Sequence, residues 1–224
     1  MLRSFLSLFR STTLRRYRVK ILSDVISDEI QKLPIYKKKK IKILDYGSGY
    51  NPILIDELIK KLRQKNKKKI IQAYCFDLYD KKQIKFMNTN ANIKFSHAND
   101  LWNNKKTRFD FCLLIDTLHH VGELDSQKVL NLTKKLKKRS KIFIIKDHLQ
   151  QGFFSNFILR CMDFIGNYEY KTSIPSKYFD NDIFNKFISK LNFVEIKRIT
   201  NQNYYKWYWF YLNNKKFHFI SILK

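Results

Sequence analysis

The chain has 224 residues, which is enough to bury the core of one domain and too few for two domains of ordinary size. Its 45 Lys and Arg residues against 19 Asp and Glu residues give a net charge of +26, which would fit a nucleic acid or an anionic membrane as partner. No apolar run approaches the roughly 18 residues that span a bilayer, so no transmembrane helix is expected. Because Lys, Ile, Asn, Phe and Tyr are frequent in apolar and polar stretches alike, we favour a genome-wide codon bias over a functional basic face.

The first predicted element is a helix over residues 14–33, which stops before Pro34. Its apolar residues recur at helical spacing, and we expect them to cover one edge of the domain. We therefore separate an N-terminal helical segment, residues 1–35, from the main domain, residues 36–224. Basic residues and no acidic one precede Asp24, so a mitochondrial transit peptide and an amphipathic helix on an anionic membrane stay open for residues 1–13.

A short apolar strand follows, and a turn with two glycines stops it at Asp45-Tyr46-Gly47-Ser48-Gly49. A helix is predicted next, with Asn51 as its cap and Pro52 at its first position. Strand, glycine turn and helix form half of a nucleotide-binding unit, because the backbone amides of such a turn can approach a ligand closely.

The details of this turn discriminate between nucleotide cofactors. Pro52 occupies the place where a dinucleotide fingerprint needs a third small residue, and no Gly-Lys-Ser or Gly-Lys-Thr of a P-loop follows. What remains is an acid near the first strand's end, two glycines, and a second acid, Asp77, that closes the strand over residues 70–77. In this pattern the sequence resembles the class I S-adenosylmethionine-dependent methyltransferases. The resemblance implies that Asp45, Gly47 and Gly49 hold the methionine end of the cofactor and that Asp77 binds its ribose hydroxyls.

Further strands occur in the order of that family. Residues 109–116 form an apolar strand that ends at Asp116, and residues 117–121 are expected to continue it. Residues 141–145 lead into Lys146-Asp147-His148, and strands over residues 193–200 and 217–223 follow. The resemblance covers residue 40 to the end and is closest to the small-molecule and lipid branch. It implies an α/β fold, with a three-layer, Rossmann-like, mostly parallel sheet whose last strand is antiparallel.

The adenine contact departs from the family pattern. After the strand around residues 93–96, the family usually has an acid that binds the adenine amino group, and this chain has His97, with Asp100 three residues later. Either of these residues or the backbone alone could serve. The cofactor-binding set implied by the resemblance also includes Asp116, and the implied cofactor is S-adenosyl-L-methionine.

Transfer of a methyl group from a sulfonium needs mainly position and orientation, but an oxygen or carbon acceptor would still need a base. His119, His120, Asp147 and His148 follow strands at the edge where parallel sheets bind ligands. One imidazole polarised by a carboxylate is therefore the candidate base, and which imidazole acts stays open. The three cysteines, Cys75, Cys112 and Cys161, show no Cys-x-x-Cys spacing, so we expect buried thiols and no metal site.

A strongly apolar stretch lies between the fifth strand and a helix expected over residues 180–191. Residues 150–178 carry apolar side chains well beyond one helix face, as is typical of a cap over a pocket for an apolar or lipid-like acceptor. The alternative is a hydrophobic helix packed against the N-terminal helix. The aromatic residues between Tyr204 and Tyr211 could stack bases, but we interpret them as core and pocket wall.

The sequence thus predicts a methyltransferase that acts on an oxygen or carbon atom, or alternatively on a nitrogen atom, of a small, apolar or lipid-like acceptor. A nucleic-acid methyltransferase is the first alternative, although no amino-directed Pro-Pro-aromatic tetrad occurs. A partner subunit that binds cofactor without catalysis is the second, because of His97. We expect a cytoplasmic protein, or a mitochondrial one in a eukaryote, with peripheral membrane contact through its basic N-terminus.

Overall fold

A central seven-stranded sheet organises the part of the chain that the computed structural model describes, namely residues 12–49, 52–64, 66–78, 92–103, 106–167, 174–204 and 214–224. Its order is β3-β2-β1-β4-β5-β7-β6, and β7 pairs antiparallel with both neighbours while the other pairs are parallel. The strands are β1 (Lys40–Tyr46), β2 (Ile70–Asp77), β3 (Ile93–His97), β4 (Phe109–Ile115), β5 (Ser140–His148), β6 (Glu195–Thr200) and β7 (His218–Leu223). The predicted fold class is confirmed.

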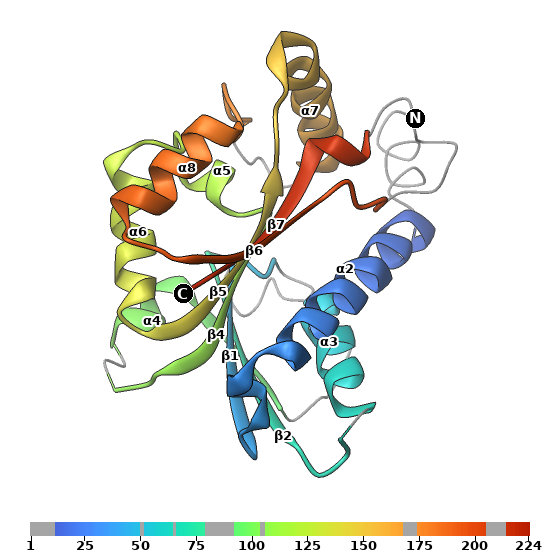
Figure 1. Cartoon of the computed structure of the whole chain (residues 1–224), viewed down its shortest axis with the longest axis vertical. Coiled ribbons are helices and arrows are strands. Elements are labelled where there is room, and N and C mark those ends of the chain that lie inside the picture. Colours follow the sequence, from blue (N-terminus) through green and yellow to red (C-terminus); the bar gives the residue numbers. More distant parts are fainter. Residues whose placement is uncertain are drawn as a thin grey trace.

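Helices cover both faces of this sheet and complete three layers (Figure 1). The helices are α2 (Thr12–Lys32), α3 (Ile53–Gln64), α4 (Ala98–Asn103), α5 (Leu118–Val121), α6 (Gln127–Lys137), α7 (Gly152–Asn167) and α8 (Asn181–Lys190), with short 3-10 turns η1 (Pro34–Lys37) and η4 (Lys215–Phe217). Side chains alternate across a strand, so β4 sends Phe111 and Leu113 toward α2 and α3, and Cys112 and Leu114 toward α6 and α8. Burial on both faces explains the unbroken apolar run of this strand.

The N-terminal helix is present as predicted, but it lies over a face of the sheet and not along an edge. Leu22, Ile26 and Ile30, spaced at four residues, are buried in one cluster with Ile144 of β5 and Ile222 of β7. The helix also packs along α3 (Figure 1). Residues 1–11 lie outside the described ranges, so the alternatives for the N-terminal residues 1–13 stay predictions, as does a domain boundary at residue 35.

Two strand boundaries differ from the predictions, and both differences shape the site. The fourth strand stops at Ile115 because Asp116 adopts a left-handed φ of 50°, and the residues that follow form α5 and not more strand. The fifth strand runs on to His148, because antiparallel β7 pairs with it as far as His148 opposite His218. Asp147 and His148 therefore lie inside a strand and not beyond its end.

Other predictions about single residues have mixed outcomes. Cys75 and Cys112 are buried in strands as expected, whereas the thiol of Cys161 is exposed on α7, so that prediction was wrong. Tyr204 is buried in the core, but the other aromatic residues of its segment, and Asn51, lie outside the described residues. Within the described helices, none is long and apolar enough to cross a membrane.

Candidate active site

The glycine turn after β1 is closely packed around Gly47 and has empty space beside Gly49. Gly47 has φ 80°, its amide donates to the carbonyl of Phe76 over 2.8 Å, and an added Cβ would lie 2.4 Å from Cγ2 of Thr117. Gly49 has φ 71°, and nothing lies within 4 Å of where its Cβ would be. The turn therefore needs Gly47 for packing, while Gly49 leaves room for a ligand to approach the backbone.

Asp77 lies at the carboxyl end of β2 and joins this turn directly. Its Oδ2 accepts a hydrogen bond from the amide of Gly49 over 2.8 Å, and its Oδ1 accepts one from Leu78 over 2.7 Å. Each carboxylate oxygen can accept two hydrogen bonds, so each retains a site for a ligand hydroxyl. The second strand thus places its carboxylate against the backbone of the glycine turn.

Asp45 is buried within β1, one strand away from Asp77. Burial, and to a smaller extent the nearby negative charge of Asp77, raise the pKa of Asp45 to about 7. The two carboxylates therefore lie on adjacent strands, close enough for the charge of one to act on the other. A cationic ligand group beside them would relieve both the burial cost and the repulsion.

The remaining predicted cofactor residues lie in different surroundings. His97 pairs in register with Asp77, and its Nδ1 accepts a hydrogen bond from the amide of Asn99 over 3.2 Å at the start of α4. Asp100 is exposed in the first turn of that helix. The carboxylate of Asp116 forms ion pairs with Lys146 of β5 and Arg18 of α2, so it already has two cationic partners. Their predicted contacts with the cofactor stay predictions.

All four residues predicted for catalysis come together at the ends of β4 and β5. Nδ1 of His119 lies 2.5 Å from Oδ1 of Asp147. The ring centroid of His119 is 4.0 Å from that of His120 and 5.0 Å from that of His148. Helix α5 begins almost directly after β4, and β4 pairs with β5, so the two short polar motifs become neighbours. We call these residues, together with Lys146, Asp163 and Tyr178, the histidine–carboxylate cluster.

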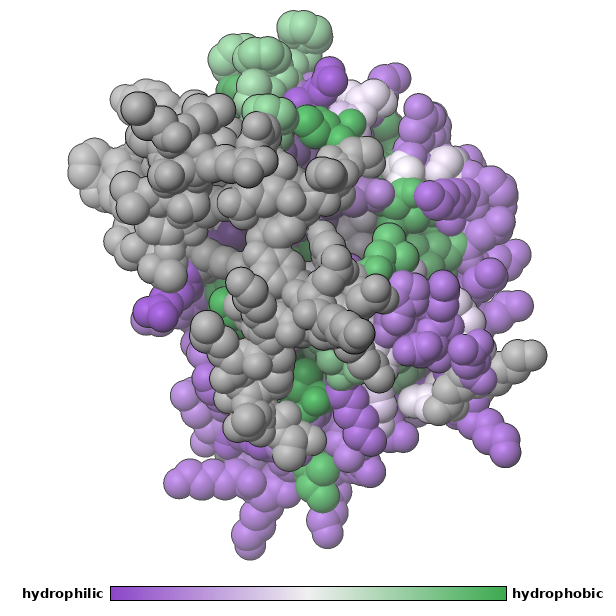
Figure 2. All heavy atoms as spheres, turned by 180° about the vertical axis from the view of Figure 1, so that it is seen from behind, coloured by the Kyte–Doolittle hydropathy of each residue, from purple (hydrophilic) through white to green (hydrophobic). Residues whose placement is uncertain are grey.

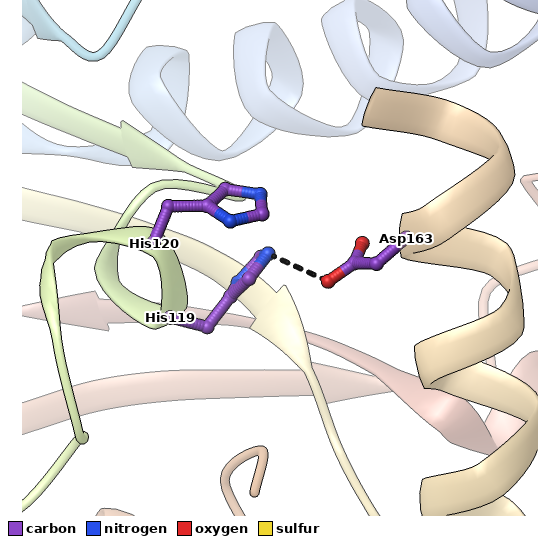
Figure 3. A group of neighbouring side chains, drawn as sticks. All are labelled: His119, His120 and Asp163. Atoms are coloured by element: carbon purple, nitrogen blue, oxygen red, sulfur yellow. Dashed lines mark ion pairs between the residues drawn. The ribbon is translucent and has the colours of Figure 1, made fainter. Parts of the chain in front are cut away.

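Two members of the cluster, Asp163 and Tyr178, were not predicted from the sequence. Oδ2 of Asp163 lies 3.4 Å from Nε2 of His119, and its Oδ1 lies 3.5 Å from Nε2 of His148. The hydroxyl of Tyr178 donates to Asp163 over 2.6 Å. Figure 3 shows Asp163 reaching from α7 toward His119 and His120 of α5. The signal for Asp163 in the sequence was an acidic residue in an otherwise apolar cap helix. A carboxylate in such a helix is buried only where hydrogen-bonding or cationic partners are present.

Burial and charge act against each other in this cluster. Burial alone would lower the pKa of His119, but Asp147 and then Asp163 outweigh it and raise that pKa. Burial would likewise raise the pKa of Asp147, but His119 holds it below its usual range. For His148 burial prevails and lowers the pKa to about 4. Burial also lowers the pKa of Lys146 well below its usual range. The neighbouring carboxylates therefore favour the protonated form of His119, whereas burial favours the neutral form of His148.

Helix α7 buries polar side chains and exposes apolar ones, which is the reverse of an ordinary surface helix. Ser155, Leu159 and Asp163, each four residues apart, are buried. Four phenylalanines of the same helix are exposed, by 88% at Phe153 and 59% at Phe157, and at Phe154 and Phe164 as well. Figure 2 shows pale green apolar atoms at the top of the molecule, the end that α7 occupies in Figure 1. The described part of α7 therefore covers the cluster with its inner face and presents an apolar face outward.

Alanine at Gly47 should destabilise the protein by about 1–3 kcal/mol, because the new Cβ meets Thr117 and the backbone is left-handed. Alanine at Gly49 meets no neighbour, so its cost should be that of the backbone alone, about 1 kcal/mol. Alanine at Gly122, whose nearest neighbour would be at an ordinary 3.4 Å, is the control and should change little. Chemical denaturation measures all three, and equal costs at Gly47 and Gly122 would contradict the packing argument.

Comparisons with known proteins agree with this architecture. A family model described as "Methyltransferase domain" matches residues 15–222. No curated protein matches the sequence. A solved cyclopropane-fatty-acyl-phospholipid synthase-like protein from Lactobacillus casei is similar in structure, with TM-score 0.62 and 10% identity, over 95% of this chain and 92% of that one. At such an identity the likeness concerns the fold alone.

Two further solved structures share the fold. A SAM-dependent methyltransferase from Archaeoglobus fulgidus is similar with TM-score 0.56 and 15% identity, over 100% of this chain and 99% of that one. An O-methyltransferase family protein from Burkholderia thailandensis is similar with TM-score 0.58 and 12% identity, over 98% of this chain and 59% of that one. This chain therefore spans about three fifths of the Burkholderia protein's length.

Proposed function

The chain belongs to the methyltransferase-domain family and is an S-adenosyl-L-methionine-dependent methyltransferase, and on this premise we propose that it methylates an oxygen atom of a small, apolar or lipid-like acceptor. The observation that carries the proposal is the buried histidine–carboxylate cluster, which lies beside the glycine turn and beneath a helix with an apolar outer face. Hydroxyl acceptors need hydrogen-bond acceptors around the attacking oxygen, and the cluster supplies them.

The residues at the ends of β1 and β2 fit the family's cofactor. The open space at Gly49 admits a ligand to the backbone, and Asp77 retains one acceptor position on each oxygen for ribose hydroxyls. Asp45 offers a buried carboxylate for which a cationic amino group would be a favourable partner. When bound, S-adenosyl-L-methionine supplies a methyl group on a positively charged sulfur, so the protein needs no covalent nucleophile.

Thr117 connects the cofactor crevice with the cluster. Its side chain packs against Gly47, and its hydroxyl donates to the carbonyl of Tyr46 over 3.2 Å. His119 and His120 follow after one intervening residue, on α5. His119 is buried, whereas His120 is half-buried. An acceptor hydroxyl placed between the turn and α5 would be held by the cluster and oriented toward the donor.

The outer face of α7 supports a lipid-like acceptor. Exposed Phe153 and Phe157 have basic residues nearby: Arg160 is exposed on the same helix, and the side-chain amide of Gln151 donates over 3.5 Å to the carbonyl of Lys216, which is also exposed. Aromatic residues flanked by cations suit an anionic lipid surface. We propose that this face rests on such a surface, with the basic N-terminal residues adding attraction, and that the acceptor enters from it.

Incubation of the full chain with labelled cofactor and separate lipid, small-metabolite and RNA extracts tests the proposal. We expect the label in an organic-soluble product of the lipid extract. The labelled methyl group should be present in that product as a methyl ether or a methyl ester. Label in RNA, with binding that falls steeply with salt, would support the nucleic-acid alternative instead. Cofactor binding without label in any extract would support the non-catalytic subunit.

Replacing Phe153 and Phe157 together with serine should weaken sedimentation with anionic vesicles by at least about tenfold, because each buried phenylalanine contributes roughly 1.5–3 kcal/mol. Val194→Ser is the matched control, since Val194 is also exposed, by 67%, but lies before β6 and far in sequence from α7. The control should bind vesicles as the parent protein does. Equal binding by the double variant and the parent would rule out this face as the lipid contact.

A further inference from the structure

His119, His120 and Asp163 converge on one point between α5 and α7. One nitrogen of each histidine and one oxygen of the carboxylate lie within 4.8 Å of one another. Figure 3 shows both imidazoles and the carboxylate directed into the same space. We propose that these three side chains bind a divalent transition-metal ion. This departs from the expectation of no metal site, which rested on the spacing of the cysteines.

The partners of these side chains orient them as ligands. Nδ1 of His119 lies 2.5 Å from Oδ1 of Asp147, so the opposite nitrogen, Nε2, is directed at Asp163. Asp163 is held in turn by the hydroxyl of Tyr178 over 2.6 Å. A carboxylate on the far nitrogen of a histidine and a hydrogen bond to a ligating carboxylate are the usual outer contacts of metal ligands, because they fix ring orientation and tautomer.

The distances suit one ion. Nε2 of His119 and Oδ2 of Asp163 are 3.4 Å apart. If each lay about 2.1 Å from a metal ion, the angle between them at the metal would be about 110°, near the tetrahedral value. Ligands of one ion lie at most about 4.2 Å apart, so the widest separation has to close by a few tenths of an ångström. His120 is half-buried and can turn by that amount.

A buried nitrogen atom without a hydrogen bond provides a second observation in favour of a metal site. Among the described residues, the buried Nε2 of His119 has no hydrogen-bond partner, although its side chain is fully buried. A buried ring nitrogen without a hydrogen bond costs free energy, and a metal ion at that position would remove the cost. The alternative is a plain ion pair in which His119 bridges Asp147 and Asp163, and that arrangement has no need of His120.

The donor set identifies the class of ion. Two imidazole nitrogens and one carboxylate oxygen suit Zn²⁺, Fe²⁺, Co²⁺ or Ni²⁺, whereas Mg²⁺ and Ca²⁺ prefer oxygen alone. Three protein ligands leave a coordination position open, as in catalytic and not structural metal sites. If the proposed function holds, the ion would act as a Lewis acid toward the acceptor oxygen. The site itself rests only on the geometry.

Cobalt binding tests the site without any methyl transfer. The full chain, stripped of metal with a chelator, is titrated with Co²⁺ and followed by its visible absorption and by calorimetry. We expect one ion per chain, displaced by Zn²⁺. His120→Ala and Asp163→Asn should each weaken binding by more than about 100-fold, since losing a ligand exceeds the roughly 10- to 100-fold effect of losing an outer partner. Asp147→Asn should show the smaller effect, and His97→Ala should bind as the parent does.

The outcomes separate this inference from the proposed function. No stoichiometric binding of Co²⁺, Zn²⁺, Fe²⁺ or Ni²⁺ would overturn the metal site, even if methyl transfer were observed. Binding that survives in both His120→Ala and Asp163→Asn would also overturn it, because the ion would then lie elsewhere. Binding lost in those two variants and kept in His97→Ala would establish the site, whether or not an acceptor had been found.

Discussion

Replacing Asp77 with alanine should weaken the binding of S-adenosyl-L-methionine by about 100-fold or more. Its carboxylate is placed to accept both ribose hydroxyls, and a hydrogen bond to a charged group contributes about 1.5–3 kcal/mol. The same carboxylate accepts the amide of Gly49, so the alanine variant also releases the glycine turn. Isothermal calorimetry with the cofactor measures the change directly.

Asp110→Ala is the matched control for Asp77→Ala, because Asp110 is also a buried carboxylate of the sheet, where Lys38 and the amide of Lys42 are its partners at the opposite edge. It should lower stability without changing the cofactor's dissociation constant. Chemical denaturation without cofactor shows how far each variant is destabilised. An unchanged affinity in folded Asp77→Ala would remove the basis of the cofactor site.

Replacing Asp45 with asparagine should stabilise the cofactor-free protein at pH 8 and at the same time weaken cofactor binding. Burial, and then the charge of Asp77, raises the pKa of Asp45 from 3.8 to about 7. Between these values the folded state keeps a proton that the unfolded state has lost, so the free energy of unfolding falls as the pH rises. Above pH 7 the cost is constant, on the order of 4 kcal/mol. Asparagine has the same shape and no charge, and so avoids this cost.

The pH dependence separates this explanation from a general effect of the substitution. Denaturation midpoints of Asp45→Asn and the parent should nearly coincide at pH 4, where Asp45 is protonated in the folded state, and diverge toward pH 8. In an Asp77→Asn background, which lacks the neighbouring charge, the divergence should be smaller and should reach its limit at a lower pH. A difference between Asp45→Asn and the parent that is the same at pH 4 and pH 8 would contradict the buried charge as its cause.

The strands and the cofactor crevice could be predicted because their signals are local. The apolar run of β1, the two glycines and the acid that closes β2 lie within about forty residues, and parallel strands bring their carboxyl ends to one edge. His119 and His120 were likewise found from a short motif that follows an apolar strand. Asp147 and His148 were found from a motif that was expected to follow the fifth strand and that lies inside it instead. For the glycine turn and the acid that closes β2, the signals come from neighbouring residues alone.

Sequence alone determined the strands and their succession along the chain, the glycine turn with its acids, and the placement of two histidine motifs near strand ends. Only the tertiary structure decided that Asp163 faces His119, that Arg18 reaches Asp116 across 98 positions, and that α7 turns its phenylalanines outward. Helical periodicity specifies which residues share a face, but not which element that face meets. Antiparallel β7 likewise extends β5 through His148, because strand length depends on the partner as well as on the strand's own residues.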